Sequence, residues 1–336
     1  MALSKQLAID LGTANCLVWE IGKGLVINEP TVVAVTLEER KVLAVGKEAK
    51  EMLGRTPEYI EVARPMREGV IADYQVTESM LRWFIRQTGT GILSFFKPEV
   101  MVCVPTGVTQ VEQRAVLDAA LSAGARVAYL IDSPLAAAIG AGIPISLAAG
   151  NMIVDIGGGA CEAAVIALGG VVVHKSVRVA GNKLDEAIIN WLKKNHNIVV
   201  GDQTAEQIKI EIGTALPSKS KEKKMAIRGR DSVSGLPRKV DLASVQVNEA
   251  INEPLAEILS AVRGVLEKTP PELVADIVDK GIILSGGTAL LNNLDKFLTR
   301  QIGVSFHVAQ EPLLCTVKGT AIALENLEEY KSSLRF

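Results

Sequence analysis

Apolar residues occur along the chain in two patterns, which predict short strands and longer helices. Uninterrupted apolar runs bounded by glycine, proline or charged residues are typical of buried strands. Helices are expected where apolar residues recur every three to four positions. The two kinds of element alternate, which predicts an α/β protein. Strands are predicted at residues 7–10, 16–21, 99–104, 152–155, 162–167 and 281–284, and helices at residues 76–87, 135–142, 248–268 and 289–300.

Particular residues mark two helix starts and one helix face. Thr109 with Glu112, and Thr204 with Gln207, have the spacing of a capping box, in which each side chain bonds the other residue's backbone amide. The helix predicted at residues 248–268 carries one apolar stripe along its length. This stripe consists of Ile251, Leu255, Ile258, Val262 and Leu266, and Pro254 falls in the first turns of the helix.

A segment that begins at Leu7 is repeated from Met152 onward. Leu-Ala-Ile-Asp-Leu-Gly-Thr in the first copy resembles Met-Ile-Val-Asp-Ile-Gly-Gly in the second. After each copy come a second strand, a glycine-containing turn and a third strand. This internal repetition predicts a duplicated α/β unit, each copy of which opens with a β-hairpin. The matched positions are Asp10 with Asp155, Gly12 with Gly157 and Cys16 with Cys161.

The length of 336 residues exceeds one ordinary hydrophobic core, so two lobes are expected. We place the first lobe at residues 1–145 together with 316–336, and the second lobe at residues 146–315. Smaller inserts are predicted at about residues 28–68 in the first lobe and 181–243 in the second. This organisation gives four subdomains around a central cleft.

The two predicted hairpin turns have the residue types that phosphate binding requires. Glycines let backbone amides approach phosphate oxygens closely, and successive amides in a turn form an anion-binding nest. Asp10 and Asp155 would flank the phosphates and orient water on a bound Mg²⁺, which keeps several waters in proteins. The alternative is a pair of structural turns in a buried sheet. The candidate residues are Gly12, Thr13, Ala14 and Asn15 in the first turn, and Gly157, Gly158, Gly159 and Ala160 in the second.

A third glycine cluster lies between a predicted strand and the helix predicted at residues 289–300. The backbone there could approach a flat ligand such as adenine, and a helix N-terminus favours anionic groups. Taken alone, the cluster would be an ordinary strand-to-helix turn. As a third turn facing the same cleft it completes a nucleotide site, with Gly286, Gly287, Thr288 and Ala289 as candidate contacts.

Composition and charge argue against several other classes of protein. A net charge of −2 gives no indication of nucleic-acid binding, and 48% hydrophobic with 22% charged residues argues against disorder. The four cysteines lie far apart and the three histidines lack ligand spacing, which favours reduced thiols in a cytoplasmic protein over a zinc site. The first residues lack the apolar core of a signal peptide. Residues 133–154 carry no charge, but their prolines and glycines predict a helix, a turn and a strand instead of a membrane span.

Motifs spread over nearly the whole chain resemble those of the MreB family of bacterial actins. The resemblance implies the actin-like fold, in which two duplicated ribonuclease-H-like lobes carry inserted small subdomains. It also implies ATP in the cleft, with Glu206, Gln207, Ile208 and Lys209 near the nucleoside; the alternative for Glu206 and Lys209 is an exposed ion pair. The motifs are Asp10-Leu-Gly-Thr-Ala-Asn15, Asn28-Glu-Pro30, Ala44-Val-Gly46, Met52-Leu-Gly-Arg-Thr-Pro57, Arg64-Pro-Met66, Gly69-Val-Ile-Ala-Asp73, Val102-Cys-Val-Pro105, Ala136-Ala-Ala-Ile-Gly-Ala-Gly142, Asp155-Ile-Gly-Gly-Gly159, Asp185-Glu-Ala-Ile-Ile189, Glu211-Ile-Gly213 and Pro270-Pro-Glu-Leu273.

The same resemblance implies partners and a location. Members of the family are expected to polymerise with themselves, as paired protofilaments, and to lie peripherally on the inner face of the cell membrane. They are expected to determine cell shape by organising cell-wall synthesis, together with morphogenesis proteins such as RodZ and MreC. No nucleic-acid partner is expected.

Two positions depart from the family in a way that predicts weak hydrolysis. Family members carry Glu-Glu-Pro before the Ala-rich helix, where the second Glu positions the attacking water, and a Thr after the triple glycine. Ser133 and Ala160 stand at those places in this chain. Such groups typically contribute about 10²–10⁴-fold in rate, so ATP is expected to bind but to be hydrolysed very slowly. Asp132 lies one residue away, which rotates it by about 100° on a helix, so we do not expect it to substitute.

Two further segments are candidate surface contacts. Ile92, Leu93, Phe95 and Phe96 lie in a predicted loop, and relatives use a loop in this region for membrane contact. Burying one such side chain contributes about 1.5–3 kcal/mol, so weak contacts would add up along a polymer; the alternative is a loop folded onto its own core. The basic run at residues 219–230 is predicted as a solvated hairpin tip, or alternatively as a contact with a neighbouring subunit or anionic lipid.

Sugar kinases and heat-shock chaperones share this nucleotide-binding architecture and are the competing functions. A sugar kinase requires a catalytic aspartate in the cleft and a substrate-binding insert. A chaperone of this kind requires a peptide-binding domain. Neither is recognisable in the sequence, so a polymer-forming ATPase is preferred.

Overall fold

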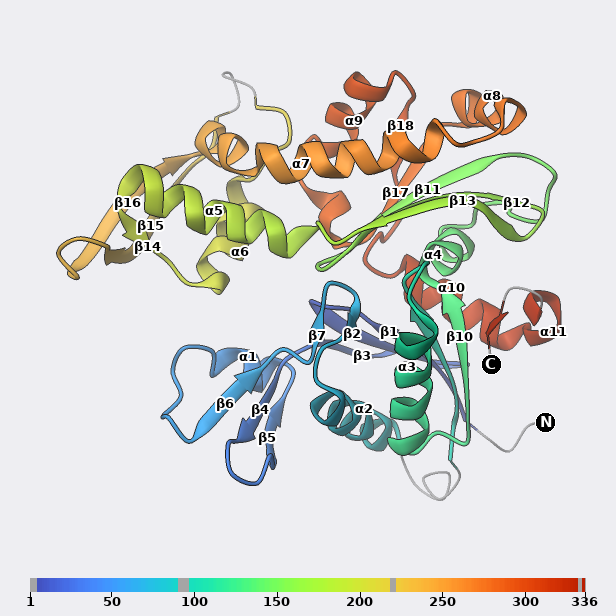
Figure 1. Cartoon of the computed structure of the whole chain (residues 1–336), viewed down its shortest axis with the longest axis horizontal. Coiled ribbons are helices and arrows are strands. Elements are labelled where there is room, and N and C mark those ends of the chain that lie inside the picture. The colour runs from blue at the N-terminus through green and yellow to red at the C-terminus, as the bar shows by residue number, and fades with distance from the viewer. Residues whose placement is uncertain (1–4, 90–96, 218–221, 332–333, 336) are drawn as a thin grey trace.

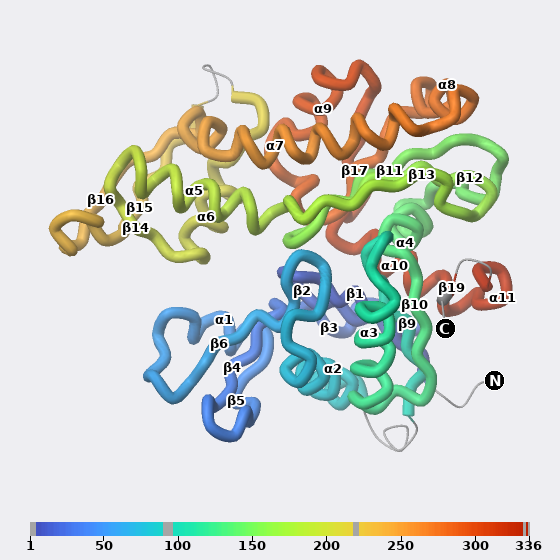
Figure 2. The backbone as a smooth tube through the Cα atoms, viewed as in Figure 1, coloured from blue at the N-terminus to red at the C-terminus, as the bar shows by residue number. Residues whose placement is uncertain are grey.

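The computed structural model describes residues 5–89, 97–217, 222–331 and 334–335. In this part of the chain two lobes lie one above the other, and each has a smaller part that extends to the same side (Figure 1). Two helices, α4 (Ser133–Gly140) and α10 (Cys315–Glu325), lie between the lobes (Figure 2). The chain passes from the first lobe to the second after α4 and returns through α10.

The first lobe is built from β1 (Gln6–Leu11), β2 (Asn15–Glu20), β3 (Gly24–Pro30), β9 (Glu99–Val104), β10 (Val127–Asp132) and β19 (Leu334–Arg335), with α2 (Tyr74–Thr88), α3 (Gln110–Ser122) and α11 (Leu327–Tyr330). The strands form one sheet in the order β19-β10-β9-β1-β2-β3. Alternate residues of β9 face opposite sides of this sheet. Val100 and Val102 belong to a core shared with α2 and α3, whereas Met101 and Cys103 belong to a core shared with α4 and α10.

The second lobe repeats this plan with β11 (Asn151–Ile156), β12 (Cys161–Ala167), β13 (Gly170–Val177), β17 (Ile282–Ser285) and β18 (Phe306–Val308). Its strand order is β13-β12-β11-β17-β18, so β11 and β12 correspond to β1 and β2. The prediction that each copy opens with an antiparallel hairpin is confirmed. The remaining elements are α5 (Gly181–His196), α7 (Ser244–Leu266), α8 (Pro271–Lys280), a 3-10 turn (Gly287–Leu290) and α9 (Leu294–Ile302).

Small sheets form the parts that extend from each lobe. In the first lobe, β4 (Val33–Thr36), β5 (Val42–Val45) and β6 (Ile60–Ala63) pair beside α1 (Lys47–Glu51), and a two-stranded ribbon of β7 (Met66–Arg67) and β8 (Val70–Ile71) follows. In the second lobe, β14 (Ile198–Val199), β15 (Lys224–Asp231) and β16 (Pro237–Ala243) pair near α6 (Asp202–Ile212). α1 and α6 therefore bring the two small parts toward each other over the same side of the molecule (Figure 1).

Two glycines let α4 and α10 touch backbone to backbone. A Cβ atom on Gly140 would lie 1.8 Å from the carbonyl oxygen of Cys315, and one on Gly319 would lie 1.7 Å from the carbonyl oxygen of Ala136. Neither position can therefore carry a side chain without separating the helices. The two connections between the lobes are thus packed directly against each other.

The predicted capping box at Thr109 is confirmed, and the one at Thr204 is wrong. The amide of Glu112 donates to Thr109 Oγ1 at 3.2 Å, and the amide of Thr109 donates to Glu112 Oε2 at 2.7 Å. Thr204 lies inside α6, because the helix starts earlier. The carbonyl of Gly201 accepts from the amides of Thr204 and Ala205, so Gly201 is the N-cap.

Two other helices begin at residues other than those predicted from the sequence. α7 carries the predicted apolar stripe but begins at Ser244, so Pro254 lies in its interior and not in its first turns. The helix predicted from Ala289 is wrong at its start, because the 3-10 turn intervenes and α9 begins only at Leu294. Asn293, which precedes α9, has a left-handed backbone conformation with φ of 58° and cannot continue a helix.

The four cysteines are buried and form no disulfide, as the sequence predicts. The uncharged segment at residues 133–154 forms α4, a turn and β11. Among the described residues, no helix combines the length and the apolar character that crossing a bilayer requires.

Candidate functional site

Three glycine-containing turns enclose a cavity of about 470 Å³ between the lobes. Ligand sites for small molecules typically measure about 300–1,000 Å³. Most of the binding residues predicted from the sequence line this cavity. They are Asp10, Gly12, Thr13, Ala14, Asn15, Asp155, Gly157, Gly158, Gly159, Ala160, Glu206, Lys209, Gly286, Gly287 and Thr288.

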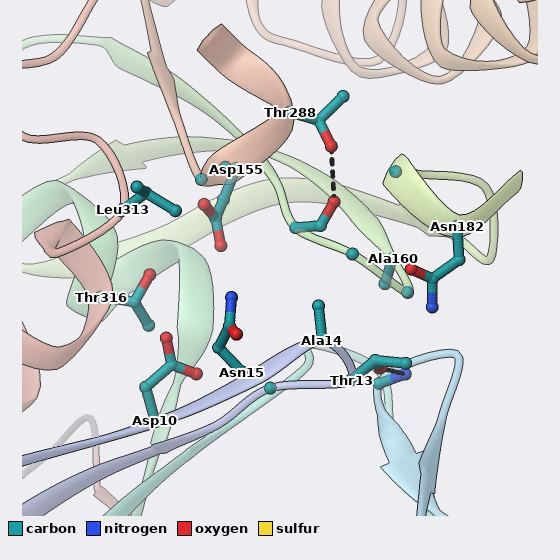
Figure 3. Close-up of a pocket in the computed structure, with 18 of the residues that line it drawn as sticks. Asp10, Thr13, Ala14, Asn15, Asp155, Ala160, Asn182, Thr288, Leu313 and Thr316 are labelled. Carbon is teal, nitrogen blue, oxygen red and sulfur yellow. Dashed lines mark hydrogen bonds between the residues drawn. The ribbon is translucent and has the colours of Figure 1, made fainter. Parts of the chain in front are cut away.

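The turns of the two hairpins touch each other across the cleft. A Cβ atom on Gly158 would lie 2.6 Å from Ala14 Cβ, and one on Gly159 would lie 2.2 Å from Thr13 Oγ1. No side chain fits at such distances, so this approach requires glycine at both positions. Figure 3 shows Thr13 and Ala14 on one side of the cleft and Ala160 on the other.

Hydrogen bonds to neighbouring elements fix the second turn. Thr288 Oγ1 donates to the carbonyl of Gly157 at 2.8 Å (Figure 3), and the amide of Asn182 donates to the carbonyl of Gly158 at 2.8 Å. Within the described chain, no backbone carbonyl accepts from the amides of Gly158 and Gly159. The carbonyls of Gly157 and Gly158 are therefore engaged by the protein, and the amides of Gly158 and Gly159 are available to an anion, as in a phosphate-binding nest.

Asp10 and Asp155 face each other from the ends of β1 and β11 (Figure 3). Burial and, to a lesser degree, the charge of Asp155 raise the pKa of Asp10 to about 7. Burial also raises the pKa of Asp155, although Ser285 Oγ donates to its Oδ1 at 2.6 Å. A nearby cation would stabilise both carboxylates.

The carboxylates fit a magnesium ion that is held mostly by water and phosphate. Within the described ranges, no group of three or more His, Cys, Asp or Glu side chains could hold a metal on its own. Mg²⁺ in proteins keeps several waters and takes one or two carboxylates together with substrate phosphates. Asp10 and Asp155, beside the two amide-lined turns, match this requirement.

Glu206 and Lys209 line the cavity from α6 but do not pair with each other. Lys209 Nζ donates to Asp185 Oδ2 at 2.8 Å and to the carbonyl of Gly181 at 2.9 Å. Glu206 Oε2 accepts instead from Lys50 Nζ of the first lobe, at 2.7 Å. The alternative of an ion pair between Glu206 and Lys209 is therefore excluded. Burial raises the pKa of Asp185 to about 6, against the opposing effect of Lys209.

Three predicted nucleotide contacts lie outside the cavity wall. Gln207 is exposed, and its Nε2 donates to Glu211 Oε1 at 2.7 Å. Ile208 and Ala289 are buried in the core of the second lobe. The helical period explains why Gln207 and Ile208 do not line the cavity. Glu206 and Lys209 lie one turn apart on the same face of α6, and the two residues between them point to other sides of the helix.

Both positions that depart from the family lie in the cavity wall. Ser133 is the first residue of α4 and is only 8% exposed, and Ala160 follows the triple glycine. Asp132 is the N-cap of α4 and is not part of the cavity wall. The site therefore has no carboxylate at position 133, where the resemblance to the family implies one.

Sequence reasoning missed several residues that the structure brings to the cavity. Glu162 lies on β12 and is 4% exposed, and burial, followed by the charge of Asp155, raises its pKa well above the ordinary value. A single charged residue within the apolar strand Cys-Glu-Ala-Ala-Val-Ile-Ala was the available signal. Asn182, Leu313 and Thr316 come from segments without a recognisable motif (Figure 3).

The two candidate surface segments have different outcomes. The loop at residues 92–96 lies outside the described residues, as do residues 219 and 221 of the basic run. From Lys224 onward the run forms β15, so the prediction of a hairpin tip is wrong for this part. Its side chains alternate, with Ile227 buried and Arg228 exposed, and the tip of the hairpin lies at residues 232–236 instead.

Comparison with known proteins agrees with the fold. The family model for MreB/Mbl proteins matches residues 4–332. The cell shape-determining protein MreB of Escherichia coli is 49% identical over 335 residues, which cover 98% of this chain and 96% of that protein. The cell shape-determining protein Mbl of Bacillus subtilis is 47% identical over 326 residues, 97% of each chain.

Solved structures of similar proteins support the same fold. MreB5 of Spiroplasma citri bound to AMPPNP superposes with a TM-score of 0.93 at 34% identity and covers 99% of both chains. A MamK double helical filament superposes with a TM-score of 0.79 at 21% identity, over 96% of this chain and 99% of that one, which supports the fold alone. The predicted actin-like fold is confirmed. By sequence and by fold, this chain belongs to the MreB/Mbl family of actin-like, cell shape-determining proteins.

Proposed function

We propose that this chain binds ATP with Mg²⁺ in its cleft and polymerises into membrane-associated filaments that help to determine cell shape. The observation that carries the proposal is the contact of two glycine turns with Asp10 and Asp155 between them. This arrangement offers amides to phosphate oxygens and carboxylates to a hydrated cation. The crystallised relatives from Spiroplasma citri were bound to AMPPNP and to ADP, which favours an adenine nucleotide here.

The remaining walls of the cavity suit a nucleoside. Ile210, Leu290 and Leu313 line it with large apolar side chains that are 67%, 57% and 47% exposed. Exposed apolar groups that converge on a cavity are typical of a site for a flat, partly apolar ligand. Glu206 and Lys209 supply polar groups on the same side.

Hydrolysis is proposed to be very slow. Mg²⁺ would neutralise charge on the phosphates, and the amides of the second turn would stabilise charge that develops on them. Ser133 and Ala160 cannot supply the charge of a carboxylate or the hydroxyl of a threonine at the family positions. Filament assembly would then depend on whether ATP is bound more than on its turnover.

The polymer, membrane and wall-synthesis parts of the proposal follow from family membership. The chain would form paired protofilaments on the inner face of the cell membrane, and it would act with morphogenesis proteins such as RodZ and MreC. A filament repeats weak surface contacts many times, so a shallow apolar loop in each subunit suffices for firm attachment.

Sedimentation combined with nucleotide turnover tests the proposal. The purified chain is expected to pellet with MgATP, while phosphate release is about 10²–10⁴-fold slower than in a relative that has both catalytic groups. Asp155→Ala is expected to remain in the supernatant under the same conditions. ADP formation that depends on an added sugar would instead indicate a kinase, and nucleotide-dependent binding of unfolded peptides would indicate a chaperone.

A further inference from the structure

A glutamate that lies outside the motifs quoted above is part of the wall of the cleft. Glu162 is the second residue of β12 and stands directly opposite Asp155 in the β11–β12 pair. The other residues of this strand are apolar, and Glu162 itself is 4% exposed. Burying a carboxylate is costly unless it is hydrogen-bonded or serves a function.

A hydrogen bond from the other lobe fixes the position of Glu162. The amide of Thr106 donates to Glu162 Oε1 at 2.7 Å. Thr106 follows β9 in the first lobe, whereas β12 belongs to the second, so the side chain is oriented by both sides of the cleft. A carboxylate can accept about four hydrogen bonds. This bond therefore leaves capacity for a donor in the cavity, such as water.

The other acidic side chains of the cavity wall have partners of their own or face the expected phosphates. Asp155 accepts from Ser285, Asp10 accepts from Cys103 Sγ at 3.3 Å, and both face the expected phosphates. Glu206 is paired with Lys50. Glu162 is the remaining acidic residue among those that line the cavity in the described chain.

We propose that Glu162 is the catalytic carboxylate of ATP hydrolysis in this chain, acting where Ser133 and Ala160 lack the family groups. This inference rests on the ATP site proposed above. In the step, the oxygen of a water forms a bond to the γ-phosphorus, and the bond from that phosphorus to the bridging oxygen breaks. The water's proton passes to Glu162 in its ionised form, which its raised pKa makes a stronger base. The proton then passes to solvent, and ADP and phosphate leave.

Glu162→Gln separates this role from a structural one. Glutamine keeps an oxygen that can accept from the Thr106 amide, but it cannot take a proton. We expect single-turnover phosphate release to fall roughly 10²-fold, while the calorimetric Kd for AMPPNP and the thermal midpoint stay close to wild type. Asp132→Asn removes a neighbouring acid that lies outside the cavity wall, and it is expected to leave the rate within about threefold of wild type.

A second variant provides a readout that a structural role would not give. Ser133→Glu combined with Glu162→Gln is expected to recover phosphate release, because a carboxylate returns to the cleft at the family position. Wild-type turnover in Glu162→Gln would overturn the inference, and so would a parallel loss of AMPPNP affinity or a failure of Ser133→Glu to rescue. Wild-type protein that binds AMPPNP without measurable turnover would also overturn it while leaving the ATP site intact. Absence of AMPPNP binding to wild type would refute the proposed function itself.

Discussion

Lys50 and Glu206 join the two small parts of the molecule across the mouth of the cleft, with Nζ 2.7 Å from Oε2. Lys50 lies on α1 in the first lobe and Glu206 on α6 in the second. The contact is reinforced by Gln203 Nε2, which donates to the carbonyl of Lys50 at 2.6 Å. Glu206 also lines the cavity, so we expect this contact to slow the release of a bound nucleotide.

Lys50→Ala is expected to speed the release of bound ADP by about two- to fivefold, because a half-exposed ion pair contributes roughly 0.2–1 kcal/mol. Stopped-flow release of a fluorescent ADP analogue measures this rate. Lys47→Ala is the matched control, since Lys47 lies on the same helix but pairs with Glu29 of its own lobe at 3.6 Å. The difference between the variants should shrink at high salt. Equal release rates for Lys50→Ala and wild type at low salt would show that the contact does not retain the nucleotide.

Gly158→Asp is expected to weaken ATP binding by at least tenfold. A side chain at this position would collide with Ala14, whose Cβ lies 2.6 Å from the added carbon, and its charge would repel the phosphates. Isothermal titration with AMPPNP measures the affinity. Gly170→Asp introduces the same charge on β13, where no atom lies within 4 Å of the added carbon, and should bind normally. Unchanged affinity in Gly158→Asp would remove this turn from the site.

Ser133→Glu together with Ala160→Thr is expected to raise phosphate release by at least tenfold, since the missing groups typically contribute about 10²–10⁴-fold. Both positions already line the cavity. Ser133→Gln with Ala160→Thr is the control. The glutamine side chain is nearly the same size as glutamate but carries no charge, so phosphate release should remain slow. The measurement is phosphate release under polymerising conditions. A wild-type rate that matches ordinary members of the family would contradict the proposal of weak hydrolysis.

Replacing Phe95 and Phe96 with serine is expected to abolish sedimentation with anionic liposomes and to leave polymerisation in solution unchanged. These two residues belong to the proposed insertion loop, where each large apolar side chain would contribute about 1.5–3 kcal/mol on burial. Val111→Ser with Leu121→Ser removes exposed apolar side chains from α3, and is the control. If the phenylalanine variant pellets with liposomes as wild type does, the loop is not the membrane contact.

Without nucleotide or divalent metal, the free energy of unfolding is expected to fall as the pH rises from about 4 to 7. Asp10 has a folded pKa of about 7 against an ordinary value of 3.8, so the folded protein holds a proton that the unfolded chain has lost in this interval. The stabilisation is complete below the unfolded pKa and is gone above the folded one. The change is on the order of a few kcal/mol. Asp10→Asn should make the profile less steep, and the remaining slope comes from the other buried acids with raised pKa values, such as Asp185.

Chemical denaturation in EDTA at pH 5 and pH 8 measures this dependence. Asp231→Asn is the control, because hydrogen bonds from the backbone of Ser234 and Val233 lower the pKa of Asp231 to about 2. Its contribution is lost only below about pH 4, so this variant should keep the wild-type slope between pH 5 and 8. A profile of Asp10→Asn as steep as that of wild type would show that Asp10 is not the titrating group.

The sequence predicted those parts of the site that a short local motif determines. Both hairpins, their aspartates and their glycines were found because a duplicated motif marks them, and they line one cavity. The contacts of Lys50 with Glu206 and of Thr106 with Glu162 join residues 156 and 56 positions apart, and no local pattern indicates such pairs. Helix starts failed for a related reason, since the backbone of Gly201 caps α6 without the side chain that a capping motif requires.

The backbone contact of Gly140 with α10 limits how this protein can change shape. Both passages of the chain between the lobes run through this point, and no layer of side chains lies there that could be compressed or repacked. Sliding one lobe over the other would open a void, whereas turning one lobe about the contact preserves it. We therefore expect the cleft to open and close by rotation of one lobe about this contact, with little translation. In a filament of such subunits, we expect a change of nucleotide state to alter the helical twist and to leave the axial repeat nearly constant.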